Sequence, residues 1–334
     1  IAKEKVEKHF PGAETACVPV ADGGEGSVDA FITALGGSKV TVKVKNPYFE
    51  DMDSYYGLIN EGKTAVIEMA GAAGITQVPD EKRNPLYTTT YGVGEVIRDA
   101  IEKGCRRFIV GIGGSATNDG GVGMLQALGY AFLDKDGKQV LPGARGLKDI
   151  TEITDAYVIP ELAECKFRVA CDVTNPLCGE LGCSAIYGPQ KGATPEMIQD
   201  MDQWLGAYAE LAKERFPKAD PKYPGTGAAG GMGFAFLTFT DAVLESGINI
   251  VLDETKLEDY IKNADFVITG EGRMDGQTAM GKAPVGVAKL AKKYGKKVIA
   301  FAGAVQRDAR ACNDAGIDAF FPILRGVVTL EEAM

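Results

Sequence analysis

Histidine is nearly absent from this sequence, since His9 is the only one in 334 residues. It stands in IAKEKVEKHF, where Ala2, Val6 and Phe10 recur every four residues and predict an amphipathic helix with His9 beside its charged face. A functional imidazole usually needs a positioned partner, so we interpret His9 as a solvated helix residue. A Ser-His-Asp triad, a Cys-His pair and a His-ligated zinc site are therefore not expected, and any proton acceptor should be a carboxylate.

Other absences narrow the class of protein further. The seven cysteines are an odd number and no two form C-x-x-C, which predicts a reduced, cytoplasmic protein. No run of Lys or Arg is long enough to follow a phosphate backbone and the formal net charge is -10, so nucleic acid is not an expected partner. Apolar runs end well before the roughly 20 residues of a membrane span, and no secretory signal is visible, so no membrane partner is expected either. A homo-oligomer is compatible with the sequence.

Alternating helical and extended patterns run through most of the chain. GVGEVIRDAIEKG (92–104) places its apolar residues along one helix face and ends at a glycine suited to a C-cap, and the strand RFIVGI follows at once. Similar strands occur in DFVITGEGRMDG (265–276), KKVIAFAG and DAFFPI. Near-continuous apolar strands between helices predict an α/β protein whose parallel sheet is covered on both faces.

Two regions have a different texture, which predicts a second domain. Residues 39–59 alternate apolar and polar side chains with period two, as antiparallel strands do. The region from about 125 to 222 mixes short strands, turns and a helix that begins after the N-cap Thr194. We therefore expect a Rossmann-like or flavodoxin-like parallel-sheet domain built from discontinuous segments, with an inserted α/β domain that has a mixed sheet. The first domain would comprise 1–38, 84–124 and 240–334, and the second 39–83 and 125–239.

Four glycine-rich turns leave the ends of expected strands, where open α/β sheets bind their ligands. They are DGGEGS (22–27), GGSATND (113–119), PGTGAAGGMG (224–233) and TGEGRMDGQ (269–277). Glycine lets backbone N–H groups approach an anion closely, and the start of a following helix adds a positive dipole end. Each turn alone is weak evidence, because tight packing also uses glycine. Four together, each interleaved with carboxylates or hydroxyls, favour one shared active site, with phosphate as the expected ligand.

The second of these turns partly matches a dinucleotide fingerprint. Gly111, Gly113 and Ala116 fit G-x-G-x-x-A after a strand, and Asp134 follows about 20 residues later, as an NAD site requires. The loop then continues through Gly123 with an amide, a carboxylate and three more glycines, so the helix starts late. The Walker pattern G-x-x-x-x-G-K-[ST] is absent. A nonstandard nucleotide or phosphoryl-transfer loop fits better, while an NAD-dependent oxidoreductase of a small hydroxy acid and a noncatalytic nucleotide-binding protein remain alternatives.

Phosphoryl transfer to a hydroxyl needs donors around the phosphoryl group, a divalent metal on oxygen ligands and a carboxylate for the proton. RVACDVTNPLCG offers Asp172 at a strand end, followed by Thr174 and Asn175, as a metal or base position, although an Asx-type turn would use the same residues. Glu68 in IEMAGAAG is another carboxylate at a strand end. Arg273 would either clamp a substrate carboxylate or form a surface ion pair.

Seven long blocks of the chain resemble the bacterial glycerate kinase family, of the glycerate 2-kinase type. The blocks are VPVADGGEGSVDAF, TTTYGVGEVIRDA, GIGGSATNDGGVGMLQALG, CDVTNPLCG, YGPQKGAT, GTGAAGGMG and DFVITGEGRMDGQTAMGKAPVGVAKLAK. The resemblance covers essentially the whole chain. It implies an ATP-dependent, Mg²⁺-requiring kinase of D-glycerate, with a Rossmann-like domain and an inserted α/β domain that enclose the active cleft. It also favours 2-phosphoglycerate as the product, with a 3-phosphoglycerate-forming kinase as the alternative.

The resemblance and the loop chemistry together give each site residue an expected role. Nucleotide phosphates would be bound by Gly113, Gly114, Ser115, Thr117, Asn118, Asp119 and Lys191. The small acid would face Asp22, Gly23, Gly24, Glu271 and Arg273. Asp172 would be a metal ligand or the catalytic base, Asp275 is a second candidate base, and Lys282 would neutralise phosphate charge.

The two ends of the sequence depart from the family pattern. The chain begins at Ile1, inside what looks like the family's first helix, and TLEEAM at its end looks like the start of a terminal helix. We therefore expect the family's opening strand and its Pro-Asp-Ser-Phe-Lys-Gly loop to be missing from this sequence. A lysine and an aspartate of the presumed site would be missing with them, and that aspartate is a third candidate for the catalytic base. A chain truly lacking these segments should have an incomplete first domain.

Overall fold

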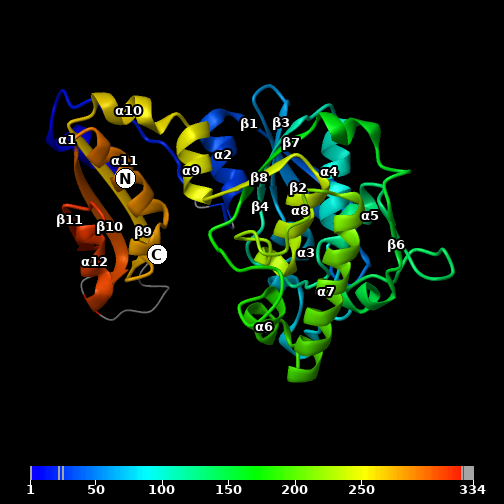
Figure 1. The fold of residues 1–334 in the computed structure, drawn as a ribbon. Coiled ribbons are helices and arrows are strands. Elements are labelled where there is room, and N and C mark those ends of the chain that lie inside the picture. Colours follow the sequence, from blue (N-terminus) through cyan, green and yellow to red (C-terminus); the bar gives the residue numbers. More distant parts are fainter. Residues whose placement is uncertain (1, 22, 25, 325, 327–334) are drawn as a thin grey trace. The chain divides into compact units, whose positions relative to one another are not determined.

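A computed structural model describes residues 2–21, 23–24, 26–324 and 326 (Figure 1). The chain divides into two compact units, of which unit 1 comprises Ile1–Asp22 and Ile248–Met334 and unit 2 comprises Gly23–Gly247. Two features that the sequence singled out, Asp22 and the closing segment TLEEAM, lie outside the described residues.

Unit 2 is built on a six-stranded mixed sheet with the strand order β1-β2-β3-β4-β7-β8. The first three strands pair antiparallel, and β3, β4, β7 and β8 run parallel to one another. The bounds are β1 (Gly37–Lys45), β2 (Asp51–Ile59), β3 (Thr64–Glu68), β4 (Arg107–Gly111), β7 (Lys166–Ala170) and β8 (Ala242–Glu245). A separate antiparallel pair is formed by β5 (Ala131–Leu133) and β6 (Glu152–Thr154).

Helices cover both faces of the six-stranded sheet, as Figure 1 shows. They are α2 (Ser27–Leu35), α3 (Ala70–Ala73), α4 (Tyr91–Glu102), α5 (Val122–Ala127), α6 (Cys183–Tyr187), α7 (Pro195–Arg215) and α8 (Met232–Phe239). Successive residues of a strand point to opposite faces. On β2, the Tyr56 hydroxyl donates to Asp99 of α4 at 2.7 Å, while a Cβ at the next residue, Gly57, would meet Val28 of α2 at 3.2 Å. Thus α4 and α2 lie on opposite faces.

Aromatic packing fixes the centre of unit 2. Phe108 of β4 and Phe167 of β7 are paired in register, and their rings stack with centroids 4.7 Å apart. Phe236 of α8 packs on Phe167 with a centroid separation of 5.6 Å. Nearly every side chain of α8 is buried, as expected for a helix that is apolar all round. Each buried phenylalanine contributes about 1.5–3 kcal/mol of hydrophobic stabilisation, so this cluster anchors the strands whose ends carry the loops described below.

Unit 1 contains a three-stranded parallel sheet with the order β11-β10-β9. The strands are β9 (Phe266–Met274), β10 (Lys297–Val305) and β11 (Ala319–Pro322). Its helices are α1 (Ala2–His9), α9 (Gly247–Glu254), which starts at the last residue of unit 2, α10 (Leu257–Asn263), α11 (Ala283–Lys293) and α12 (Ala311–Asp314). Its core joins Val267 and Val298 of the sheet to Val285 and Ala288 of α11, all buried.

The α/β fold with parallel strands is confirmed, but the division of the chain differs from the expected one. The helix expected at 92–104 is α4, the strand after it is β4, and residues 39–59 form the antiparallel pair β1 and β2. Segment 84–124 was expected in one domain with 240–334. It belongs to unit 2 instead, because β4 hydrogen-bonds to β3 on one side and β7 on the other. Segment 23–38 belongs to unit 2 as well.

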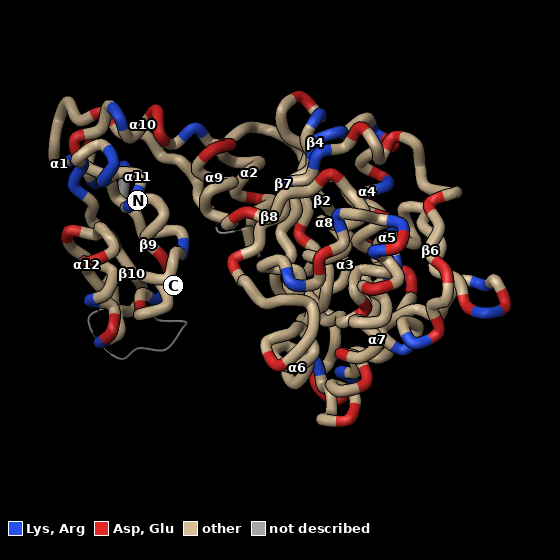
Figure 2. Tube along the Cα trace, in the orientation of Figure 1, with Lys and Arg blue, Asp and Glu red and all other residues tan. Residues whose placement is uncertain are grey.

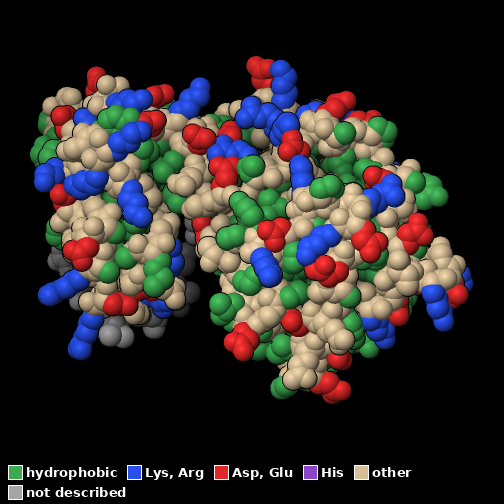
Figure 3. Space-filling view, viewed as in Figure 1, with side chains coloured by type: hydrophobic (Ala, Val, Ile, Leu, Met, Phe, Trp, Pro, Cys, Tyr) green, Lys and Arg blue, Asp and Glu red, His purple; other side chains and the backbone are tan. Residues whose placement is uncertain are grey.

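Charged residues of both signs are interspersed along the chain, as the trace in Figure 2 shows. On the face shown in Figure 3, acidic and basic side chains alternate over unit 2. Within the described residues, no helix combines the length and apolar composition that crossing a bilayer requires.

Candidate functional site

The carboxyl ends of the four parallel strands of unit 2 meet at one edge of the sheet. Glu68 ends β3, the loop 113–119 follows β4, Asp172 follows β7, and Gly247 comes two residues after β8. Ligands in open α/β sheets bind beyond this edge. The edge therefore brings together residues that are far apart in the sequence and were predicted to share a site.

The segment that begins at Gly23 passes over the ends of β4 and β7. A Cβ at Gly111 would lie only 2.0 Å from the Gly23 carbonyl oxygen, and a Cβ at Gly23 would lie 2.4 Å from the Ala170 Cβ. Gly23 also has a φ of 85°, which other residues rarely adopt. Close backbone approach thus explains the glycine at both positions and places Gly23, a predicted substrate-binding residue, over the strand ends.

Glu68 holds the helix that follows this segment. Its side chain is buried, and its Oε1 accepts a hydrogen bond of 2.8 Å from the Val28 backbone N–H in the first turn of α2. A carboxylate at a helix N-terminus is stabilised by the free N–H groups and the helix dipole. Glu68 therefore stabilises the start of α2 at the site.

The loop 113–119 is open at its start and buried at its end. Gly113 and Gly114 are exposed, and no atom of the described residues lies within 4 Å of a Cβ placed at Gly113, whereas Ser115 to Asp119 are buried. Segment 69–75 lines one side, with the Ile75 N–H donating to the Gly114 carbonyl at 2.8 Å. The loop thus exposes backbone at Gly113 and Gly114 while its later residues turn into the core.

Asn118 and Asp119 support the loop from beneath, which differs from the expected ligand contact. Asn118 is fully buried, and its amide donates to the Ser184 hydroxyl at 2.8 Å. The Asp119 carboxylate accepts hydrogen bonds from the N–H and hydroxyl of Thr90 and from the N–H groups of Gly121 and Gly123, at 2.8 to 3.3 Å. Burial raises the pKa of Asp119, although these hydrogen bonds oppose the shift. Asp119 joins the starts of α4 and α5 instead of facing the loop's open side.

Lys191 is also beneath the loop. It ends the short 3-10 helix Pro189–Lys191, is only 2% exposed, and donates from Nζ to the Ser115 hydroxyl at 2.9 Å and to the Thr117 carbonyl at 2.6 Å. Burial lowers the pKa of Lys191 to about 8. The lysine predicted to neutralise nucleotide phosphates is therefore engaged in holding the loop.

The glycine-rich turn 224–233 packs against the back of the loop. Gly230 has a φ of 68°, its carbonyl accepts from the Gly120 N–H at 2.9 Å, and a Cβ there would lie 2.1 Å from the Thr117 carbonyl oxygen. A Cβ at Gly231 would lie 2.7 Å from the Gly120 Cα. These glycines permit close packing of two loops. The turn therefore supports the loop 113–119 and does not itself bind an anion.

Asp172 is the exposed carboxylate of the strand-end cluster. It follows β7, and its Oδ1 accepts a hydrogen bond of 3.2 Å from the Gly247 N–H. Among the described residues no three His, Cys, Asp or Glu side chains gather as a ready-made metal site. Mg²⁺ commonly binds one or two carboxylates and completes its shell with water and phosphate oxygens, and the exposed carboxylate of Asp172 fits that donor set.

Four of the predicted residues lie in unit 1, on or just after β9. Thr278 donates to Glu271 at 2.5 Å, and Arg273, which is mostly exposed, pairs with Asp275 at 3.2 Å. Asp275 is buried, and its Oδ1 accepts from the N–H groups of Gln277 and Thr278, so it closes an Asx-type turn. Burial acts to raise its pKa, but Lys282, the two N–H groups and Arg273 together lower it. The geometry of Asp275 differs from that of an accessible base.

Several buried polar atoms around the loop have no hydrogen-bond partner among the described residues. They include the Thr117 hydroxyl, the Asn118 carbonyl oxygen, Gln77 Oε1 and Arg83 Nε. Such groups are costly unless water or a ligand satisfies them. The sequence singled out neither Gln77 nor Arg83, and no motif or spacing marks them.

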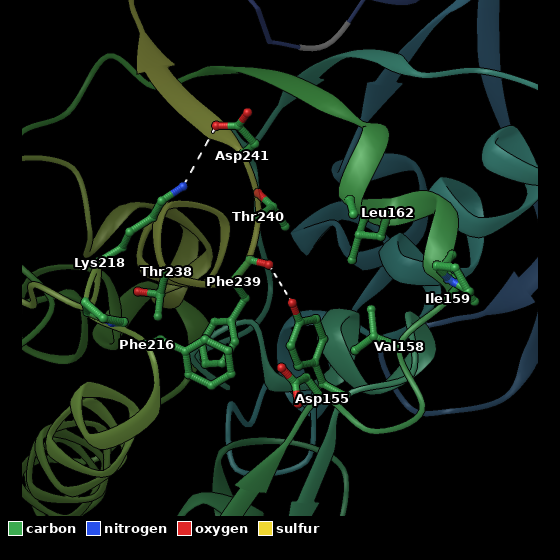
Figure 4. Close-up of a pocket in the computed structure, with 14 residues that line it drawn as sticks. Asp155, Val158, Ile159, Leu162, Phe216, Lys218, Thr238, Phe239, Thr240 and Asp241 are labelled. Carbon is green, nitrogen blue, oxygen red and sulfur yellow. Dashed lines mark hydrogen bonds and ion pairs between the residues drawn. The ribbon is translucent and has the colours of Figure 1, made fainter.

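A cavity of about 450 Å³ in unit 2 lies at the other edge of the sheet (Figure 4). Residues that precede β7 and β8 line it, including Leu162, Thr240 and Asp241. Within it Tyr130 donates to the Phe239 carbonyl at 2.6 Å and Lys218 pairs with Asp241 at 3.9 Å. Because it borders the amino ends of these strands, this cavity is not part of the strand-end cluster.

Comparison with known proteins identifies the family. The profile of the Glycerate kinase family matches residues 1–334. A glycerate kinase from Haemophilus influenzae is 50% identical over 97% of this chain and 86% of that protein, and a glycerate 2-kinase from Escherichia coli K12 is 48% identical over 97% and 85%. A crystal structure provisionally described as glycerate kinase 2 from Salmonella typhimurium LT2 superposes with a TM-score of 0.92 at 45% identity, covering 99% of this chain and 87% of that one. The chain therefore belongs to the glycerate kinase family and is an enzyme of the kinase class.

Proposed function

We propose that this enzyme transfers the γ-phosphoryl group of ATP to D-glycerate, with Mg²⁺, and releases 2-phosphoglycerate. The observation that carries the proposal is the similarity to glycerate kinases over almost the entire chain, including 48% identity to the glycerate 2-kinase of Escherichia coli K12. A kinase of this family implies ATP as the co-substrate. The 2-position rests on that relative, and a 3-phosphoglycerate product remains the alternative.

In this proposal the open start of the loop 113–119 receives phosphate oxygens of ATP. Gly113 and Gly114 expose backbone, and no side chain in the described part of the chain crowds Gly113, so N–H groups there can approach an anion closely. The later residues of the loop act indirectly. Lys191 holds Ser115 and Thr117, and Asp119 holds the turn into α5. A loop fixed from beneath needs little reorganisation when charge develops above it.

Asp172 is the proposed metal ligand, and its exposed carboxylate also makes it the preferred base. When bound, Mg²⁺ would neutralise charge on the transferred phosphoryl group. The carboxylate is anchored through Oδ1 by the Gly247 N–H, which orients it and leaves Oδ2 for a metal or a substrate proton. The alternative base, Asp275, has its Oδ1 in a turn and its Oδ2 on Arg273, so Asp172 is favoured.

For unit 1 we propose that Glu271, Arg273 and Lys282 face the small acid and its phosphate. Arg273 is exposed and carries a planar guanidinium suited to a carboxylate. The three parallel strands of this unit are compatible with the Rossmann-like domain expected from the sequence. Gly23 and Gly24 of unit 2 remain proposed substrate contacts.

The NAD-dependent alternative requires an acidic residue that binds ribose, and Asp134 is not available for this role. Asp134, which would bind a ribose, accepts hydrogen bonds from the N–H groups of Asp136 and Lys138 at 2.9 Å and closes a turn after β5. A carboxylate used this way is not free at the end of a neighbouring parallel strand, as a dinucleotide site requires.

Product analysis tests the proposal directly. The protein would be incubated with D-glycerate, ATP and Mg²⁺, and the products resolved by ³¹P NMR against 2- and 3-phosphoglycerate standards, with L-glycerate and a chelator as controls. We expect 2-phosphoglycerate only with D-glycerate and free Mg²⁺. Exclusive 3-phosphoglycerate would overturn the position of transfer, and no phosphoglycerate at all would overturn the kinase proposal.

A further inference from the structure

Lys191 was predicted to contact the phosphates of the ligand, but in the structure its ammonium group is engaged below the loop 113–119 of unit 2. Phosphoryl transfer to a small acid brings the phosphates of ATP and a substrate carboxylate together, and kinases stabilise such charge with metal ions and with Lys or Arg. Lys191 is 98% inaccessible and already donates to Ser115 and Thr117, below the loop's open side. Besides Arg273 and Lys282, which are proposed to act from unit 1, a basic side chain of unit 2 near the loop is therefore a candidate to contact the anion.

Arg83 lies between the two segments that hold this loop. It directly follows the short 3-10 helix Asp80–Lys82, and its backbone packs against the residue after Lys191: a Cβ at Gly192 would lie 2.2 Å from the Arg83 carbonyl oxygen. The chain from Arg83 then continues to Thr88, whose hydroxyl donates to the Ala116 carbonyl at 2.8 Å. The backbone of Arg83 thus contacts the segment of Lys191, and the chain five residues later, at Thr88, contacts the loop.

The guanidinium of Arg83 has unused donor capacity in a partly buried position. Its Nη2 pairs with Asp80 Oδ1 at 2.6 Å, but the Asp80 side chain is 85% exposed, and such surface pairs are weak and easily exchanged. Nε is buried and has no partner within the described part of the chain. A buried N–H without an acceptor is unfavourable, and a ligand oxygen would remove that cost. Nε and one Nη form the fork that binds carboxylate and phosphate through two parallel hydrogen bonds.

We propose that Arg83 is an anion-binding residue of this enzyme and that its guanidinium takes an oxyanion of the bound substrates. The oxyanion is either the carboxylate of glycerate or a phosphate of ATP, since both present the same pair of oxygens. The role deepens the proposed function and rests on it for the identity of the two substrates.

Steady-state kinetics of Arg83→Gln and Arg83→Lys test this role. Loss of a charge-assisted bidentate contact should raise one KM, or lower kcat, by about 10- to 100-fold in Arg83→Gln. Arg83→Lys keeps the charge but loses the fork and should recover part of the loss. A rise in the KM for D-glycerate alone identifies the carboxylate, and a rise in the KM for ATP alone identifies a phosphate. Kinetics within twofold of the parent for both variants would overturn the proposal.

Two matched variants and one binding measurement keep the outcome specific. Asp80→Asn removes the surface partner, and Arg98→Gln removes an arginine of α4 that pairs with Glu102, and both should stay within twofold of the parent. Calorimetric titration of the parent and of Arg83→Gln with D-glycerate and with a nonhydrolysable ATP analogue gives a readout that does not need turnover. If the parent forms no phosphoglycerate but binds a ligand that Arg83→Gln binds at least 10-fold more weakly, the anion site stands while the proposed function fails. Equal Kd values, or no binding of either ligand by the parent, would overturn the anion site.

Discussion

The buried ammonium of Lys191 predicts an unusual pH dependence of stability. Its pKa is about 8 in the folded protein, against an ordinary value of 10.5, and burial is the main cause. Between these values the unfolded chain keeps a proton that the folded chain has lost, so rising pH stabilises the folded state. The two pKa values give a penalty of roughly 3 kcal/mol at pH 7 that falls to about 2 kcal/mol at pH 9, a gain of about 1 kcal/mol.

The substitution Lys191→Met isolates this effect. Methionine fills a similar volume without a charge, so the variant loses the penalty and its pH dependence together. It also leaves Ser115 and the Thr117 carbonyl without a donor, at a cost of about 1–3 kcal/mol each that does not change over this pH range. The absolute stability of the variant at pH 7 is therefore not diagnostic. The difference in unfolding free energy between variant and parent should instead shift by about 1 kcal/mol in favour of the parent between pH 7 and pH 9.

Urea unfolding followed by tryptophan fluorescence measures this difference in unit 2, which contains Lys191. Trp204, in α7 of unit 2, is the only tryptophan in the sequence, so its signal reports on the unit that contains Lys191. Parent and variant would be unfolded at pH 7, 8 and 9, and groups titrating in both proteins cancel in the comparison. A difference that stays constant across this range would refute the reasoning and show that Lys191 titrates as an ordinary lysine.

Three further predictions follow from the same site. Asp119→Asn should destabilise unit 2 by about 1–3 kcal/mol in the same fluorescence assay, because it leaves the buried donors of Thr90, Gly121 and Gly123 without their charged acceptor; unchanged unfolding would contradict this. Asp172→Asn should lower phosphoglycerate formation at least about 100-fold while leaving unfolding unchanged, since the carboxylate is exposed, and near-normal turnover would remove it from the mechanism. Gly230→Ala should be destabilised by more than about 1 kcal/mol beyond Gly62→Ala, because both positions have positive φ but only Gly230 abuts the Thr117 carbonyl; equal losses would show that backbone strain alone matters.

Periodicity predicted the local elements well, because each depends on neighbouring residues. The 3.6-residue pattern of 92–104, the alternation in 39–59 and the cap at Thr194 all correspond to observed elements. The division into units was missed because it depends on which strands pair, and the apolar strand at 107–111 has no feature that distinguishes β3 and β7 as partners from β9 or β10.

Site residues were harder to predict because the sequence shows residue type but not depth. Asn118 and Asp119 look like ligand-facing groups in a polar loop, yet they are buried and face inward. Lys191 was predicted to belong to the site, but the sequence did not show that its side chain lies beneath the loop 113–119. Arg83 carries no motif, and only its unpartnered Nε and its contact with Gly192 in the folded chain draw attention to it.

The carboxylate of Asp119 accepts from the residue that precedes α4 and from the first residues around the start of α5. If the start of either helix moved away, the buried carboxylate of Asp119 would lose hydrogen bonds and would become exposed to water or unsatisfied. The opening turns of the two helices should therefore behave as one cooperative unit in native-state hydrogen exchange, with matching protection at the Thr90, Gly121 and Gly123 amides. A nucleotide that tightens the loop above would then slow exchange in α4 as well as in α5, although α4 itself does not follow that loop in the chain.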